Sequence, residues 1–589
     1  MIKTLAKCIR QAKLPAIITP IFVLLESFIE VSIPTVMAKL IDEGITPSEA
    51  YPNGNMDAVL KYGVILAILT LAAMFFGVTA GYTASRASSL FSRNVRHDMF
   101  YNIQNYSFSN IDKFSPASLV TRLTTDVTNV QSSFQMLTRI VFRAPAMLIF
   151  AFVFSFRTDS ELAMVFLYVI PFLAIILALI VKLAFPIFRK VFTTYDDLNN
   201  VVEENLRGIR VVKSFVREEH EKSKFRKISE KIFKLFTKAE KTVALNAPAM
   251  QISVYTCIIL ISWLGAQAVV ASGNNEALGL TTGSLMSLFT YTMQILMSLM
   301  MLSMIFVMLT MSKASADRVC EVLNEKSDIN DGERNLTEIK DGSIEFRNVC
   351  FKYFKTAENN ALDHINLTIK SGETVGIIGG TGSSKSTLVQ MIPRLYDTIE
   401  GEVLVGGENV RDYNLEALRN NVAMVLQKNV LFSGTIAENI RWGNENATDE
   451  EVEQVCKSAC ADDFIQAMPD KYNTYIEQGG TNVSGGQKQR LCIARALLKK
   501  PKILILDDST SAVDTKTDAM IRRAFKEDIP DTTKIIIAQR VSSVCEADKI
   551  IIMDNGKIAD MGTHDELYAR SPIYREIYDS QTKGASDDE

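Results

Sequence analysis

The fold of this chain is decided by one stretch, Gly379-Gly380-Thr381-Gly382-Ser383-Ser384-Lys385-Ser386-Thr387. It follows an apolar run, Val375 to Ile378, and leads into a second apolar run that begins at Leu388. Small residues allow backbone N–H groups to converge on phosphate oxygens, and the start of a helix adds the positive end of its dipole. The stretch therefore predicts a phosphate-binding loop, in which Lys385 reaches the β- and γ-phosphates and Ser386 brings its hydroxyl to Mg²⁺.

One position departs from the pattern G-x-x-x-x-G-K-[ST], because Ser384 stands where the pattern has glycine. Its Cβ falls where the backbone turns tightly. A glycine-rich run taken alone is also compatible with an ordinary turn, so the interpretation depends on motifs farther along the chain.

Two such motifs follow about a hundred residues downstream. The apolar run Ile503 to Leu506 ends in Asp507, which is the arrangement of a strand whose terminal carboxylate holds Mg²⁺. Upstream of it, a Ser-Gly-Gly opens a predicted helix, and the start of that helix is a second anion site. The segment reads Asn482-Val483-Ser484-Gly485-Gly486-Gln487-Lys488-Gln489-Arg490.

The N-terminal half has the composition of a membrane domain. Mean hydropathy is +0.12 over 589 residues, and the apolar excess falls before residue 312. The net charge of −4 argues against a nucleic-acid-binding protein with a basic face. A helix needs about 20 apolar residues to cross the hydrocarbon of a bilayer. Six runs are long enough, at approximately 15–38, 60–82, 135–156, 161–185, 246–271 and 284–311.

Charge orients these spans. The segments 40–60 and 271–311 contain no Lys or Arg, whereas 84–134 and 186–243 contain many. The positive-inside rule then predicts that both termini and the two long loops lie in the cytoplasm. We expect a multi-pass protein of the plasma (inner) membrane. The two long loops keep helical apolar spacing, so we expect the spans to continue into the cytoplasm and to turn at short helices near 114–121 and 211–215.

Glu26 and Glu30 lie four residues apart on one face of the first span, and the sixth span is rich in methionine, including Met297 and Met301. Carboxylates within a membrane face a cavity or a partner, and methionine side chains adapt to ligands of differing shape. One interpretation is a substrate cavity for cationic or hydrophobic compounds. The alternatives are a hydrogen bond between helices for the glutamates and core or lipid-facing packing for the methionines.

The eight cysteines are scattered, and we expect them to be reduced. Cys456 and Cys460 lie one helical turn apart, but no second pair completes a zinc site.

Taken in order, the motifs resemble those of ATP-binding-cassette (ABC) exporters, with Val483 in place of the leucine of the LSGGQ signature. The resemblance implies a fold class of six transmembrane helices with long cytoplasmic extensions, followed by an α/β nucleotide-binding domain. It divides the chain into an elbow helix (1–14), a membrane domain (15–312), a linker (313–342), an ATPase domain (343–579) and a polar tail (580–589).

The resemblance also implies roles for individual residues. Tyr353 matches the aromatic residue that stacks on adenine, and Gln427 matches the Q-loop glutamine, which joins Ser386 and Asp507 as a Mg²⁺ ligand. In this family two halves pair head to tail and bury two ATP molecules between them. Five residues would then act on the partner's ATP: Ser484, Gly485, Gly486 and Gln487, and Asp514 at the end of Ser511-Ala512-Val513-Asp514.

Besides Val483, three positions depart from the family pattern, and these three lie on one side of this interface. Asp508 replaces the glutamate that acts as general base, Gln539 replaces the histidine that contacts the γ-phosphate, and Ser384 replaces the loop glycine. A positioned base contributes roughly 10²–10⁴ in rate. Because the signature motif is complete, we expect a slow, degenerate site and a heterodimer with a different half-transporter.

The resemblance leaves three functions open. The first is ATP-driven export of hydrophobic or amphipathic compounds, with cationic drugs as one class. The second is a dedicated exporter or flippase of one lipid or peptide. The third is an ATP-gated channel or regulatory protein on the same scaffold, which the absence of a regulatory insertion disfavours. A few importers share this architecture, and six spans exclude a soluble cassette ATPase.

Overall fold

The computed structural model describes residues 1–47, 53–275, 279–354, 357–509 and 513–583. The chain divides into two compact units. The first comprises Met1–Gln104 and Ser115–Glu325, and the second comprises Asn105–Phe114 and Lys326–Glu589. The second unit therefore includes a short segment from within the N-terminal half of the sequence.

Within the described residues, the first unit contains helices joined by short connections and no strand. Six of its helical segments are long and apolar enough to cross a membrane within the described residues, which confirms the six predicted spans. Two π-helical turns, Leu40–Ile45 and Arg122–Asp126, interrupt the regular helices. The helices are α1 (Ile2–Lys7), α2 (Lys13–Lys39), α3 (Met56–Gln104), α5 (Pro116–Thr121), α6 (Val127–Thr158), α7 (Ser160–Arg207), α8 (Ile209–Ser214), α9 (Glu218–Ala244), α10 (Asn246–Ser272) and α11 (Thr282–Asn324).

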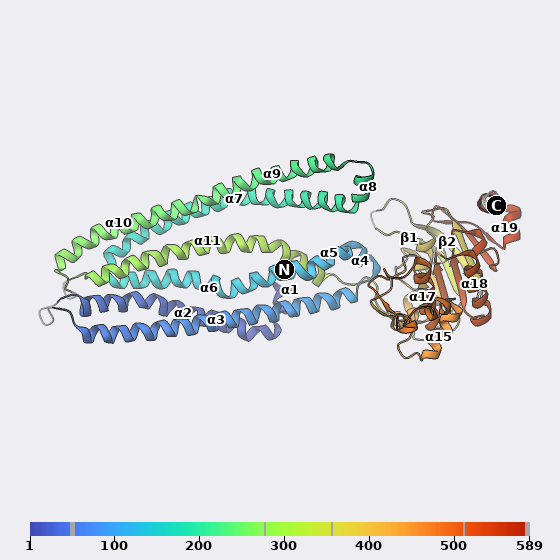
Figure 1. Cartoon of the computed structure of the whole chain (residues 1–589), viewed down its shortest axis with the longest axis horizontal. Helices are drawn as coiled ribbons and strands as arrows, with labels where there is room; N and C mark the ends of the chain where they lie inside the picture. The colour runs from blue at the N-terminus through green and yellow to red at the C-terminus, as the bar shows by residue number, and fades with distance from the viewer. Residues whose placement is uncertain (48–52, 276–278, 355–356, 510–512, 584–589) are drawn as a thin grey trace. The chain divides into compact units, whose positions relative to one another are not determined.

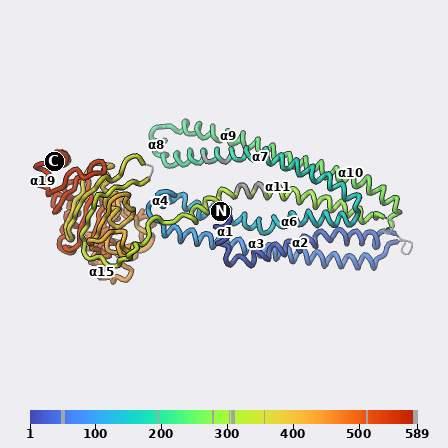
Figure 2. The backbone as a smooth tube through the Cα atoms, turned by 180° about the vertical axis from the view of Figure 1, so that it is seen from behind, coloured from blue at the N-terminus to red at the C-terminus, as the bar shows by residue number. Residues whose placement is uncertain are grey.

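Several of these helices are much longer than a bilayer requires. The 49 residues of α3 extend over about 70 Å at about 1.5 Å per residue, whereas the hydrocarbon is about 30 Å thick. Helices α7 and α9 run side by side and are joined by α8 (Figures 1 and 2). The short helices α5 and α8 lie where the sequence predicted turns of the long loops.

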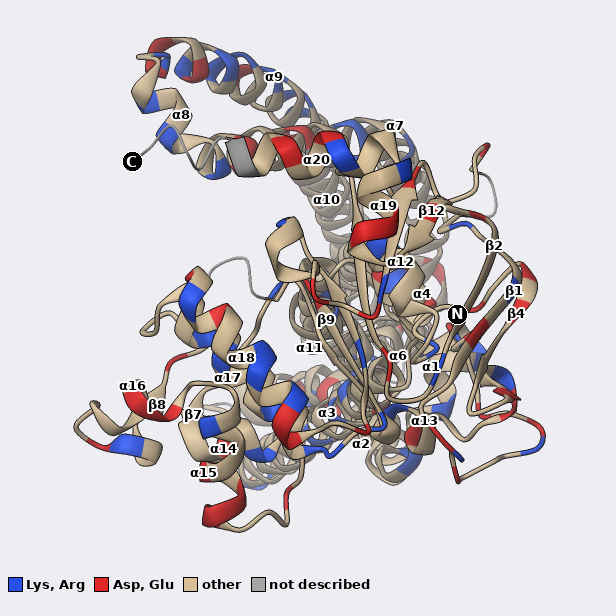
Figure 3. Ribbon diagram, turned by 90° about the vertical axis from the view of Figure 1, so that its right-hand side faces the viewer, with Lys and Arg blue, Asp and Glu red and all other residues tan. Residues whose placement is uncertain are grey.

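An ion pair and a hydrogen bond join α7 and α9 near this turn. Lys224 of α9 lies 2.6 Å from Glu204 of α7, and the Asn205 amide donates a 3.2 Å hydrogen bond to Glu221. Acidic residues gather in the first turn of α9, and basic residues predominate along the rest of the helix (Figure 3).

The second unit is an α/β domain with a central six-stranded sheet in the order β12-β11-β3-β10-β9-β6. A four-stranded antiparallel sheet, β2-β1-β4-β5, and a short β7-β8 pair complete it. The strands are β1 (Ile344–Phe351), β2 (Leu362–Ile369), β3 (Thr374–Gly379), β4 (Glu400–Val405), β5 (Glu408–Asn409), β6 (Val422–Val425), β7 (Gly434–Thr435), β8 (Tyr475–Ile476), β9 (Ile503–Asp507), β10 (Thr533–Ile537), β11 (Lys549–Asp554) and β12 (Lys557–Gly562).

Ten helices of the second unit are described. They are α4 (Phe108–Phe114), α12 (Lys385–Gln390), α13 (Leu415–Asn421), α14 (Ile436–Arg441), α15 (Asp449–Ser458), α16 (Asp462–Gln466), α17 (Gly485–Leu498), α18 (Thr515–Asp528), α19 (His564–Arg570) and α20 (Pro572–Lys583).

Alternation along the buried strands builds two apolar cores, one on each face of the six-stranded sheet. Ile377 packs into the core that also contains β1 and β2, whereas the next residue, Ile378, packs into the core formed with α17. Strand β3 pairs in parallel with both β10 and β11. The phosphate loop therefore leaves the sheet at the carboxyl end of an interior strand, where neighbouring parallel strands also end.

Candidate nucleotide site

The phosphate loop has the backbone geometry of a tight strand-to-helix turn. Gly379 has φ +153°, and a Cβ at this position would lie 2.1 Å from the carbonyl oxygen of Met553. Ser384 has φ +69° and caps the start of α12, so a residue with a side chain occupies the left-handed region. Ser384, which replaces the glycine of the pattern, thus lies at a position whose backbone conformation favours glycine.

Lys385 folds back over the loop. Its Nζ donates hydrogen bonds to the carbonyl oxygens of Gly379 (2.9 Å) and Gly380 (2.8 Å), and it lies 3.3 Å from the Ser383 hydroxyl. Burial lowers the pKa of Lys385, while the carboxylates of Asp508 and Asp507 oppose this effect. An arriving phosphate offers this half-buried ammonium stronger acceptors than the loop carbonyls do.

The Mg²⁺ ligands predicted from the sequence lie together in part. The Ser386 hydroxyl donates a 2.9 Å hydrogen bond to Oδ1 of Asp507, which is buried at the end of β9. Burial raises the pKa of Asp507. A hydroxyl and a carboxylate are the hard oxygen ligands that Mg²⁺ prefers, and a cation beside Asp507 offsets the cost of burying its charge. These residues therefore fit Mg²⁺.

The two residues that replace the general base and the switch histidine contact each other directly. Gln539 donates a 2.6 Å hydrogen bond through Nε2 to Oδ2 of Asp508, and Gln427 donates a longer one, 3.4 Å, to the same oxygen. Asp508 has φ +50° and is buried. The backbone N–H of Asp508 bonds to the carbonyl of Ile537, the last residue of β10. Adjacent strand ends thus bring Asp508 and Gln539 together.

Tyr353 lies against the helix that follows the phosphate loop. Its hydroxyl shares a 2.8 Å hydrogen bond with the hydroxyl of Thr387, and its ring packs edge-on against Phe351 and Tyr396. The side chain remains partly exposed, at 44%. The aromatic residue predicted to stack on adenine is therefore held beside the phosphate loop.

The signature residues form their own cluster at the start of α17. The Ser484 hydroxyl accepts a hydrogen bond from the Gln487 N–H, and the Gln487 side chain accepts one from the Ser484 N–H. This reciprocal cap occupies the Gln487 side chain and precedes the free N–H groups of Gly485 and Gly486. Asp514 similarly caps α18 by accepting a 2.9 Å hydrogen bond from the Thr517 N–H. Of the preceding D-loop residues, Ser511 and Ala512 lie outside the described residues.

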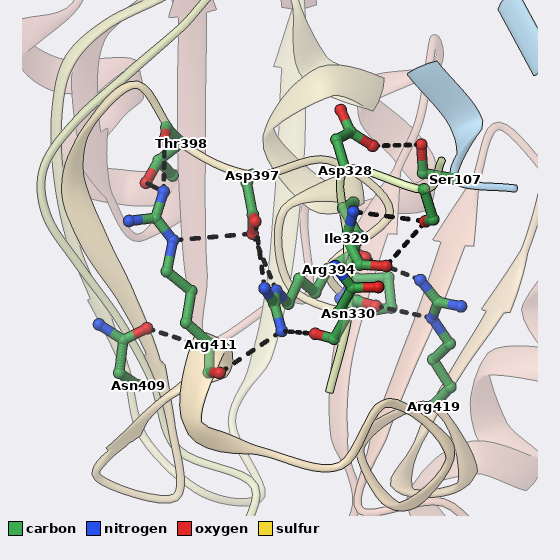
Figure 4. A network of polar contacts seen from close by, with 12 residues as sticks. Ser107, Asp328, Ile329, Asn330, Arg394, Asp397, Thr398, Asn409, Arg411 and Arg419 are labelled. Carbon is green, nitrogen blue, oxygen red and sulfur yellow. Dashed lines mark hydrogen bonds and ion pairs between the residues drawn. The ribbon is translucent and has the colours of Figure 1, made fainter. Parts of the chain in front are cut away.

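A polar network missed by the sequence analysis lies beside the loop that follows α12 (Figure 4). Arg394 is buried, pairs with Asp397 at 2.8 Å and donates a 2.9 Å hydrogen bond to the carbonyl of Asn330. Nearby, both Ser107 and Ser109, just before and within α4, donate hydrogen bonds to Asp328. The network ties residues 328–330, in the middle of the linker, to residues far away in the sequence, and no local pattern marks it.

Glu26 and Glu30, proposed for a substrate cavity, share one arginine in the structure. Arg143 of α6 lies 2.5 Å from Oε1 of Glu26 and 2.8 Å from Oε2 of Glu30, both on α2. The Oε2 atom of Glu26 is buried without a hydrogen-bond partner among the described residues. Met297 and Met301 are exposed on α11 of this single chain. Through Arg143 the glutamates connect α2 to α6.

Comparisons with known proteins follow the same division of the chain. Residues 16–299 match the family of ABC transporter transmembrane regions, and residues 362–511 match the ABC transporter family. The uncharacterized ABC transporter ATP-binding protein YfiB of Bacillus subtilis (strain 168) is 36% identical over 95% of this chain and 95% of its own length. The ATP-dependent lipid A-core flippase of Pseudoalteromonas translucida (strain TAC 125) is 31% identical over 91% of this chain and 90% of its own.

The fold also has a close structural counterpart. A solved structure of a bacterial Atm1-family ABC exporter with ATP bound superimposes with a TM-score of 0.81, at 24% identity, over 97% of this chain and 99% of that chain. The membrane helices and the α/β unit described above thus recur in one polypeptide in the same order. This chain belongs to the ABC transporter family, as an exporter half in which a membrane domain is fused to an ATP-binding ATPase domain.

Proposed function

We propose that this chain binds Mg²⁺-ATP at a slow site and, in a heterodimer, supplies its signature motif to the ATP of a different half-transporter. The observation that carries the proposal is the 2.6 Å hydrogen bond from Gln539 to Asp508. This hydrogen bond occupies Oδ2 of Asp508, the oxygen that a general base would use to accept a proton from the attacking water. It also occupies the side-chain amide of Gln539, which replaces the histidine that contacts the γ-phosphate in the family.

Geometry at Asp508 adds to this effect. An aspartate is one methylene shorter than the family's glutamate, and a base acts only within hydrogen-bond reach of the water. Both amides, from Gln427 and Gln539, donate to the same oxygen, Oδ2. A water approaching the γ-phosphate therefore competes with two donors for a carboxylate that lies farther away.

ATP binding itself does not depend on these substitutions. Lys385, Ser386 and Asp507 retain the family's residue types, and Ser386 already contacts Asp507. Ser386, Asp507 and Gln427 would hold Mg²⁺, which neutralises charge on the β- and γ-phosphates. The cap at Ser484 leaves the N–H groups at the start of α17 directed outward, which supports a role toward a partner's nucleotide.

The transported compounds are hydrophobic or amphipathic, and they leave the cytoplasm across the plasma (inner) membrane. Two carboxylates face one guanidinium in the Glu26–Arg143–Glu30 cluster, and this formal excess of negative charge favours cations among them. Export or flipping of one lipid is the second candidate, supported by the relative named as a lipid A-core flippase.

The heterodimer is tested by measuring ATP hydrolysis of the purified chain alone and with a co-expressed second half-transporter. Alone, the chain binds ATP, but its hydrolysis rate is lower than that of the pair by a factor of about 10² or more. Lys385→Ala in this chain is the control, because it removes ATP binding here and leaves the partner's loop intact. Robust hydrolysis by the single chain contradicts the proposal.

The substrate class is tested with inverted membrane vesicles that contain the pair. ATP-dependent uptake of fluorescent cations supports a drug exporter, whereas movement of labelled lipid between leaflets without cation uptake supports the flippase. Glu30→Gln distinguishes the drug exporter from the flippase further. If the excess negative charge of the cluster attracts cations, this substitution lowers the uptake of cations more than the uptake of neutral compounds.

A further inference from the structure

The antiparallel sheet of the second unit contains an irregularity between β1 and β2. The strands pair Val349 with Ile365 and Phe351 with Leu362, so a single residue, Cys350, lies opposite two consecutive residues of β2. Those two residues are Asp363 and His364, and His364 has φ +52°. A bulge of this kind redirects side chains that otherwise alternate between faces, and it gathers three metal-binding residue types at one point.

One ligand atom from each of these residues lies within 4.8 Å of the other two. The Nε2 atom of His364 is 3.8 Å from Oδ1 of Asp363. Bonds of about 2.0–2.3 Å to a tetrahedral zinc ion place its ligand atoms about 3.6 Å apart. Small side-chain rotations are therefore sufficient to bring all three atoms onto one ion.

Neighbouring groups orient the two strongest ligands. Asn348 Oδ1 lies 2.8 Å from Nδ1 of His364, and a hydrogen bond from Nδ1–H to this acceptor leaves the Nε2 lone pair available to a metal. The sulfur of Cys350 accepts a 3.3 Å hydrogen bond from the backbone N–H of His364. Such outer contacts fix the orientation of ligands around a bound metal.

The cluster is separate from the apolar cores and opens to solvent on one side. Val349 and Phe351 both belong to the core beneath the sheet, so the intervening Cys350 is directed to the opposite face. Cys350 is buried, whereas His364 is exposed. This combination leaves room for a solvent molecule as a fourth ligand, as in open zinc sites.

One cation already competes for the carboxylate. Lys557 of β12 lies 3.1 Å from Oδ2 of Asp363, and the Asn360 amide donates to Oδ1 at 2.9 Å. The side chain of Lys557 is exposed, so it moves away from an arriving divalent ion at little cost.

We propose that Cys350, Asp363 and His364 form a binding site for a zinc-like divalent transition-metal ion. Binding releases the thiol proton of Cys350 to solvent and forms one bond each to sulfur, imidazole nitrogen and carboxylate oxygen, with water in the fourth position. The ion links β1 to β2 three residues before Tyr353 and therefore restrains the strand that leads to the adenine-binding residue.

The test is Co²⁺ titration of the purified, chelator-treated full chain. Thiolate-bound Co²⁺ produces a near-ultraviolet charge-transfer band, which we expect to saturate at one equivalent. Cys350→Ser removes the band and His364→Ala weakens binding about tenfold or more, whereas the matched control Cys545→Ser leaves it unchanged. ATP binding by each variant verifies that the protein is folded.

A second variant tests the competition for Asp363. Lys557→Ala tightens Co²⁺ binding several-fold if Asp363 is a ligand, and Zn²⁺ displaces Co²⁺ from the same site. Absence of the band in the wild-type chain, its persistence in Cys350→Ser, or unchanged affinity in Lys557→Ala overturns the proposal.

Discussion

The hydroxyl of Tyr396 donates a 2.7 Å hydrogen bond to a carboxylate oxygen of Asp112, and the ring of Tyr396 lies edge-on to Tyr353 at 5.3 Å. Phe108 of α4 also packs against the Tyr396 ring. Since Tyr353 bonds to Thr387 beside the phosphate loop, a continuous series of contacts runs from α4 to the nucleotide site.

Tyr396→Phe removes one end of this series and keeps the ring. A hydrogen bond to a charged group contributes about 1.5–3 kcal/mol when buried, and less here because Asp112 is exposed. In Tyr396→Phe we expect the ATP affinity to change by less than about threefold. Substrate-stimulated ATP hydrolysis by the assembled transporter should fall several-fold. An equal loss of affinity and stimulation contradicts a coupling role. Tyr475→Phe, an exposed tyrosine, is the control.

The double substitution Asp508→Glu with Gln539→His restores the family's residue types at the site that we propose is slow. The longer carboxylate regains reach, and an imidazole replaces the amide that now bonds to Asp508. We expect hydrolysis by the chain alone to rise about 10²-fold, with the single substitutions each giving much less, because the two side chains contact each other. Additive effects of the two single changes indicate that this contact does not restrain the base.

Arg143→Met leaves Glu26 and Glu30 without their shared cation. Removing one partner of a buried ion pair destabilises a protein by about 3–5 kcal/mol, so we expect a large drop in the thermal stability of the detergent-solubilised chain. Glu26→Gln should lower stability more than Glu30→Gln, because the Glu26 side chain is only 10% exposed against 38% for Glu30. The melting temperatures of the three variants rank their stabilities. If Glu30→Gln is less stable than Glu26→Gln, Glu26 is not the more buried partner of Arg143.

Gly379 and Gly380 form a matched pair for testing the phosphate loop. A Cβ at Gly379 collides with the Met553 carbonyl. A Cβ at Gly380 has no described atom within 4 Å apart from those of its neighbours in the chain. Gly379→Ala therefore requires movement of β3 against β11 and should destabilise the domain by about 1–3 kcal/mol, while Gly380→Ala leaves the nucleotide-free fold intact. Chemical unfolding followed by tryptophan fluorescence measures the difference.

Asp507 links function to stability through its ionisation. Burial raises its pKa, so its stabilising contribution is present below the unfolded value of about 3.9 and is lost as pH rises through the folded value. The ionised form of this buried carboxylate is therefore destabilising. Asp507→Asn should raise the melting temperature of the nucleotide-free protein and abolish Mg²⁺-dependent ATP binding.

The same measurement on Asp514 gives the opposite sign. The Thr517 N–H lowers the pKa of this carboxyl, so its contribution is present above the unfolded value and lost as pH falls. Asp514→Ala should lower the melting temperature through loss of the helix cap at the start of α18. A fall in melting temperature for both variants contradicts the assignment at Asp507.

Sequence reasoning succeeded where the determining pattern is local. The phosphate loop lies between a buried strand and a helix within a few residues, and the six spans are defined by the length of their apolar runs. The turns at α5 and α8 were predicted because the long loops keep helical spacing and have few breakers.

It failed where distant residues meet. Glu26 and Arg143 are 117 positions apart, and only helix packing shows that they pair. Asp508 and Gln539 were each recognised as substitutions, but their contact depends on β9 and β10 being neighbours. The cluster at Cys350 depends on a bulge, which shifts the register by one residue and leaves no motif in the sequence.

The second unit is not a continuous piece of the chain, since it takes in Asn105–Phe114 as well as everything from Lys326 onward. During synthesis, residues 105–114 of the second unit therefore leave the ribosome long before the residues from 326 onward are made. Helix α4 must remain available while α5 to α11 are made and inserted, and the surface around Tyr396 is completed only afterwards. A fragment that starts at Lys326 therefore lacks α4, which is part of the unit to which that fragment belongs.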